Sequence, residues 1–121
     1  EEFAVLEAAN GEEGLEYLEE HEEDISLVLL DIIMPVMDGF EVLRVMSEKN
    51  FLDNIPVIMI SSEESETYVK KAYEMGAMDY INRPFDAQVV YRRVFNTIKL
   101  YAKQRRLIAL VTDQIKSELK K

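Results

Sequence analysis

The stretch Leu27-Val28-Leu29-Leu30-Asp31 decides the fold class. Four consecutive apolar residues without polar alternation predict a strand that is buried on both faces, as in parallel sheets covered by helices on two sides. Residues 57–60, Val-Ile-Met-Ile, repeat this pattern and end at Ser61. The pair Tyr80-Ile81 predicts a shorter third strand, and residues 3–6 predict another near the start of the chain.

Segments with helical signals separate these strands. Asn10 is placed to cap a helix that starts with two glutamates, and the apolar spacing in residues 40–46 predicts a second helix. Residues 66–75 predict a third helix, ended by Gly76. Asp86 can cap the helix after it, and no Gly or Pro interrupts the chain from there to its end, so the sequence predicts one long final helix. Regular alternation of strand and helix specifies an α/β fold, a doubly wound parallel sheet with right-handed crossovers.

Composition limits the class of protein. The chain has 121 residues, no cysteine, and no apolar run near the ~20 residues that cross a bilayer. We therefore expect one cytoplasmic domain without disulfides, thiolate metal sites or membrane contact. Residues 1–90 contain 22 Asp and Glu against 5 Lys and Arg, whereas residues 91–121 contain 2 against 9. The net charge of −10 argues against direct nucleic-acid binding by the whole chain.

Three polar side chains follow the predicted strands. Ligand sites of such sheets lie at the carboxyl ends of the strands, where Asp31, Ser61 and Arg83 are expected to meet. A carboxylate nucleophile beside a hydroxyl donor and a guanidinium would suit an acyl-phosphate site, because the donor and the cation can hold the transferred oxygens. The alternative is a structural ion pair between Asp31 and Arg83.

Three motifs in this order resemble the receiver domain of bacterial response regulators, the CheY-like proteins. They are the phosphoacceptor segment in residues 27–39, the strand and hydroxyl in residues 55–63, and the strand and loop in residues 76–85. The resemblance covers residues 3 to about 100 and implies the flavodoxin-like receiver fold. It also implies a phosphorelay switch, not an enzyme, that accepts a phosphoryl group from a histidine kinase or phosphotransfer protein.

The resemblance assigns roles to individual residues. It implies that Asp31 is the phosphoacceptor and that Mg²⁺ is held by Asp31 and the backbone carbonyl of Ile33. It further implies a cis peptide at Pro84 and a switch in which Ser61 moves toward the phosphoryl group while the ring of Tyr80 changes rotamer. The residues expected to bind phosphate are Ser61, Ser62 and Arg83.

Two departures from the family pattern bear on these roles. The family usually has lysine where this chain has Arg83, so phosphorylation or dephosphorylation rates are expected to differ. The chain also opens at the family's second strand, without the first strand, the first helix and the acidic pair that supplies the other Mg²⁺ ligands, so we expect weak or absent Mg²⁺ binding. We favour a sequence that omits these residues over a strand supplied by a swapped partner or a fold-back of residues 107–113, which would bring Asp113 as a substitute acid.

The end of the chain predicts a linker. We expect a receiver domain in residues 1–100 and, in residues 101–121, a coiled-coil-like helix leading to an absent output domain. A heptad seam supports this linker, and the alternatives are a frayed helix or a strand at residues 107–113.

Homodimers are expected through this helix or through the face of the family's fourth helix, fifth strand and fifth helix. Competing functions are a pseudo-receiver that only docks or dimerises, and a hydrolase with an aspartyl-phosphate intermediate. The heptad seam that supports the predicted linker is formed by Ile98, Tyr101, Arg105, Ile108, Thr112, Ile115 and Leu119.

Overall fold

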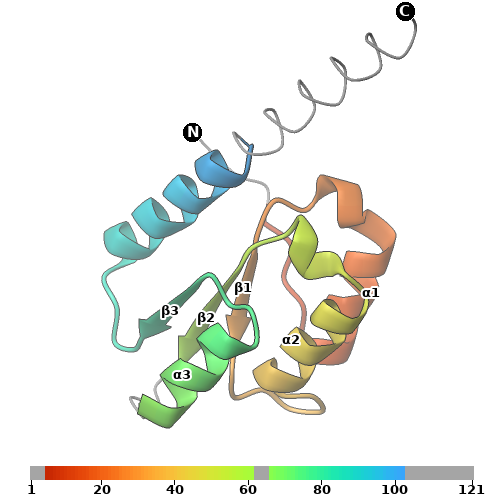
Figure 1. Cartoon of the computed structure of the whole chain (residues 1–121), viewed down its shortest axis with the longest axis horizontal. Helices are drawn as coiled ribbons and strands as arrows, with labels where there is room; N and C mark the ends of the chain where they lie inside the picture. The colour runs from red at the N-terminus through yellow and green to blue at the C-terminus, as the bar shows by residue number, and fades with distance from the viewer. Residues whose placement is uncertain (1–4, 62–65, 103–121) are drawn as a thin grey trace, which may run out of the picture.

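A three-stranded parallel sheet forms the centre of the molecule in a computed structural model that describes residues 5–61 and 66–102. The strands are β1 (Val28–Asp31), β2 (Val57–Ser61) and β3 (Asp79–Asn82), in the spatial order β1-β2-β3 (Figure 1). The register pairs Asp31 with Ile60 and Ser61 with Asn82, so all three strands end at the same edge of the sheet. The predicted α/β class is confirmed.

Helices cover both faces of this sheet. The chain passes through α1 (Gly11–His21), α2 (Gly39–Glu48) and α3 (Glu66–Glu74), with short 3₁₀ turns at Glu22–Asp24 and Phe51–Asp53. Residues 87–102 are helical and lie across the sheet from the other helices (Figure 1).

Polar side chains start the helices as the sequence predicts. The Asn10 side chain accepts a hydrogen bond from the Glu13 amide at 2.9 Å and thereby caps α1. Asp86 accepts one from the Gln88 amide at 2.8 Å at the start of the last helix. Each cap satisfies a backbone donor that the first turn leaves without a partner.

Two apolar clusters hold the layers together. The larger lies under α1, α2 and α3, where side chains such as Leu18, Leu43 and Ala72 pack against Val57 and Met59. The smaller cluster, Ile58, Ile60 and Ile81, is on the other face and packs against Val90 and Val94 of the last helix. β2 is buried along its whole length because it lies between two strands and two helical layers.

Two sequence predictions about strands were wrong. Residues 5 and 6, the described part of the predicted strand at residues 3–6, form no strand, and the Val5 side chain is 77% exposed. No described strand lies beside them, so their backbone groups have no ladder to join. β1 is also not buried on both faces, because Leu29 is 48% exposed on the sheet face that the last helix covers only in part.

The predicted linker lies mostly outside the described residues. Ile98 and Tyr101 belong to the helical segment 87–102, while the seam from Arg105 onward and the alternative strand at 107–113 are not described. The division at residue 100 therefore stays a prediction. Within residues 5–61 and 66–102, no helix is long and apolar enough to span a membrane.

Candidate functional site

Asp31 and Arg83 meet at the carboxyl edge of the sheet. Asp31 is the last residue of β1, and its Oδ2 accepts a hydrogen bond from Arg83 Nη1 at 2.9 Å in an ion pair. The other carboxylate oxygen, Oδ1, accepts from the Ile33 amide at 3.1 Å. The Asp31 side chain is 31% exposed and that of Arg83 44%, so the pair is open to a reactant from solvent.

The end of β3 sets the place of Arg83. Its backbone amide donates to the Ser61 carbonyl at 2.9 Å, which extends the β2–β3 ladder by one residue. The Arg83–Pro84 peptide is cis, the geometry that the family resemblance implies. The guanidinium side chain is thus carried by a backbone that is bonded to the neighbouring strand.

Ser61 and Tyr80, the residues expected to form the switch, lie in the interior. Ser61 is fully buried and follows Ile60, the register partner of Asp31, so it lies one position beyond the carboxylate on the adjacent strand. Tyr80 is 7% exposed and belongs to the larger apolar cluster. Ser62 lies outside the described residues. The structure therefore brings Asp31 and Arg83 into contact and places Ser61 nearby on the next strand.

Two residues that sequence reasoning did not assign shape the loop after Asp31. The Gly39 amide donates to the Ile32 carbonyl at 2.8 Å, and a Cβ atom at Gly39 would lie 2.4 Å from the Asp31 carbonyl oxygen. Val36 has a φ of 70°, which is rare for a β-branched residue. In the sequence Gly39 belonged to the phosphoacceptor segment at 27–39 without a role of its own, and no sequence signal pointed to Val36.

The described residues fit a magnesium ion poorly on their own. They contain no group of three His, Cys, Asp or Glu side chains that could hold a metal. Asp31 supplies a carboxylate at this edge, and one of its oxygens is already paired with the Arg83 guanidinium. Mg²⁺ requires several oxygen ligands in octahedral geometry, so this part of the chain supplies too few.

Residues 1–95 match the family model of the response regulator receiver domain, and the chain belongs to this family. It is 34% identical over 101 residues to the heme response regulator HssR of Staphylococcus saprophyticus, which is 84% of this chain and 43% of that protein. It is 37% identical over 82 residues to the two-component response regulator-like PRR37 of Oryza sativa subsp. japonica, or 68% of this chain and 11% of that one. The chain thus spans less than half the length of these curated relatives, and the family places it in two-component signalling.

Solved structures agree with this family. The CheX-CheY-BeF3-Mg²⁺ complex from Borrelia burgdorferi contains a chain 38% identical to this one, with a TM-score of 0.69 over 78% of this chain and 69% of that chain. The predicted flavodoxin-like receiver fold is confirmed.

Proposed function

We propose that this chain is a phosphorylation-controlled switch in which Asp31 accepts a phosphoryl group from the phosphohistidine of a histidine kinase or phosphotransfer protein. A carboxylate oxygen of Asp31 forms the new bond to phosphorus, the bond between phosphorus and the imidazole nitrogen breaks, and the nitrogen keeps the electron pair. The chain is the acceptor in this step and does not turn over a substrate, so we do not propose that it is an enzyme.

The contact between Asp31 and Arg83 carries the proposal. The Asp31 carboxylate, the proposed nucleophile, and the permanent cation of Arg83 lie 2.9 Å apart at a solvent-open strand end. After transfer, the phosphoryl oxygens would bring more negative charge to the same point, and the forked guanidinium can donate to them. Ser61 on the adjacent strand and Ser62 beyond it are the proposed hydroxyl donors, and Tyr80 is the proposed partner of Ser61 in the switch.

Mg²⁺ enters this proposal as a weakly held ion. Asp31 and the carbonyl of Ile33 are its proposed ligands in this chain, and stable binding would need further carboxylates. Such an ion would neutralise charge on the phosphoryl oxygens.

The output of the switch is proposed to pass through the face formed by α3, β3 and the last helix. Exposed aromatic and apolar side chains lie there, including Tyr73, Met78 and Tyr91. An ion pair between Arg93 and Asp79, 3.7 Å apart, ties the last helix to β3. The same proposal includes homodimers that form through this face or through residues 101–121. It also includes a cytoplasmic location and an output domain beyond the linker.

A second candidate function is a pseudo-receiver that docks or dimerises without phosphorylation. It is favoured by the same ion pair, because Arg83 already neutralises the Asp31 carboxylate. The shortage of carboxylates for Mg²⁺ in the described residues favours it as well.

Acetyl phosphate distinguishes the two candidates. The complete natural polypeptide would be incubated with acetyl phosphate, with and without Mg²⁺, and its intact mass followed beside an Asp31→Asn variant. A switch gains one phosphoryl mass that depends on Mg²⁺ and on Asp31. No gain under any Mg²⁺ concentration would leave the docking module as the better explanation.

A further inference from the structure

α3 is lightly attached to the core. Among its nine residues Ala72 is the buried one, whereas α2 buries five of its ten. Tyr68 and Tyr73 of α3 are both exposed. Helices with little buried apolar surface open and shift at lower free-energy cost, so a few surface contacts can decide the position of α3.

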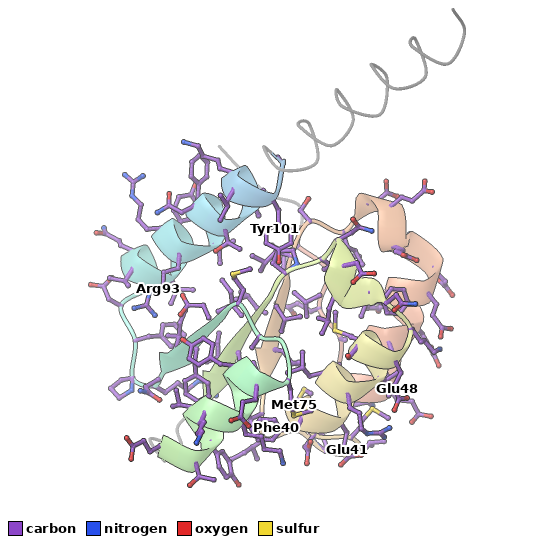
Figure 2. The ribbon with its side chains drawn as sticks, in the orientation of Figure 1. Phe40, Glu41, Glu48, Met75, Arg93 and Tyr101 are labelled. Carbon is purple, nitrogen blue, oxygen red and sulfur yellow. The ribbon has the colours of Figure 1, made fainter. Side chains whose placement is uncertain are left out.

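Two side chains of α3 contact the same ring of α2. The rings of Phe40 and Tyr68 meet edge to face, with centroids 5.5 Å apart and an interplanar angle of 79°. The Lys71 ammonium lies 4.4 Å from the centroid of the Phe40 ring, within the range of a cation–π interaction. Figure 2 shows Phe40 between α2 and α3. We call this group, Phe40, Tyr68 and Lys71, the Phe40 clamp.

The clamp is attached to the strand end that carries the candidate phosphoacceptor. Phe40 follows Gly39, whose amide bonds to the Ile32 carbonyl and whose Cα lies against the Asp31 backbone. The Phe40 ring is itself 8% exposed and packs in the larger apolar cluster. It is therefore a fixed point relative to Asp31, while the side chains that contact it belong to the lightly attached α3.

We propose that the Phe40 clamp holds α3 in its unphosphorylated position and thereby sets how easily the switch turns on; this rests on the proposed function. Four residues separate Ser61 at the end of β2 from Glu66 at the start of α3. A movement of Ser61 toward a phosphoryl group would therefore be passed to the first turn of α3, where Tyr68 lies. The clamp contacts stabilise the state in which they form, and they must be lost or weakened as α3 moves.

Loss of the Lys71 cation is expected to favour the activated state. In the complete natural polypeptide, Lys71→Gln should tighten the binding of beryllofluoride with Mg²⁺, a phosphoryl surrogate, by about two- to five-fold. This range equals about 0.5–1 kcal/mol, the usual strength of an exposed cation–π contact. Amide hydrogen exchange in α3 should quicken in the unliganded variant, because the resting position is less stable.

Three further variants make the test specific. Lys70→Gln removes the same charge from the same exposed helix and should leave the affinity at the wild-type value. Lys71→Arg keeps a cation over the Phe40 ring and should also leave the beryllofluoride affinity at the wild-type value. In a Phe40→Leu background, Lys71→Gln should have no further effect, because the ring is already gone.

Each other result overturns the inference. Equal affinities for Lys71→Gln and Lys70→Gln would show that the clamp is structural only, and a full effect of Lys71→Gln in the Phe40→Leu background would show that charge alone acts. Failure of the wild-type protein to bind beryllofluoride would instead remove the proposed function, and this inference with it.

Discussion

Replacement of Gly39 by alanine should disrupt the junction between the Asp31 strand end and α2. The added Cβ would lie 2.4 Å from the Asp31 carbonyl oxygen and 2.8 Å from the Ile32 Cα, where ordinary contacts begin at 3.4 Å. The two backbones must therefore separate by about 1 Å, and the 2.8 Å hydrogen bond from the Gly39 amide to the Ile32 carbonyl is lost with them. Overpacking of about 1–3 kcal/mol and a hydrogen bond of about 1 kcal/mol predict a loss of about 2–4 kcal/mol.

Urea denaturation followed by circular dichroism measures this loss. With a slope of about 2 kcal/mol per molar urea, in the middle of the usual range, the midpoint of Gly39→Ala should fall by about 1–2 M. Gly14→Ala is the matched control, because its Cβ would meet only the Ala8 Cβ at 3.6 Å inside α1. That variant should gain about 0.5–1 kcal/mol from helix propensity. A Gly39→Ala midpoint within experimental error of the wild type would refute the inferred close approach.

Two further predictions concern the surface. Val36 is exposed and has a φ of 70°, a conformation that asparagine tolerates better than valine. Val36→Asn should therefore stabilise the protein by about 1 kcal/mol in the same denaturation assay. An unchanged or lower urea midpoint would show that the valine is not strained. Partial desolvation of the Tyr73 hydroxyl, whose side chain is otherwise exposed, and the charge of Asp79 raise the pKa of this hydroxyl, and Asp79 Oδ1 accepts its hydrogen bond at 3.4 Å. A raised folded pKa contributes stability below the unfolded value of about 10 and loses it as pH rises through the folded value. The unfolding free energy of the wild type relative to Tyr73→Phe should therefore be constant up to about pH 10 and fall above it, and a constant difference across that range would contradict the shift.

Patterns confined to one strand or one helix were predictable from the sequence. Residues 28–30 and 57–60 of the predicted apolar runs lie in strands, and Asn10 and Asp86 cap helices. The location of the candidate site was also predictable, because parallel strands end at one edge of the sheet and this brings Asp31 to Arg83. Both the functional hypothesis and the simple ion-pair alternative expected this contact, and its position at an open strand end of a receiver-family chain favours the functional hypothesis.

Features that depend on distant partners were not predictable. Residues 5 and 6 are apolar and suited to a strand, but a strand needs a neighbour, and none lies beside them in the described sheet. Leu29 has the character of a core residue, yet its exposure depends on what covers that face. The Phe40 clamp joins residues about thirty positions apart, and no periodic pattern connects them.

The most direct test of the central claim identifies the residue that carries the phosphoryl group. The complete natural polypeptide would be phosphorylated with acetyl phosphate and Mg²⁺, reduced with borohydride, which converts an aspartyl phosphate to homoserine, and analysed by peptide sequencing in a mass spectrometer. We predict homoserine at position 31 and at no other aspartate. Homoserine at another position, or none after a proven phosphorylation, would contradict the assignment of Asp31 as the phosphoacceptor.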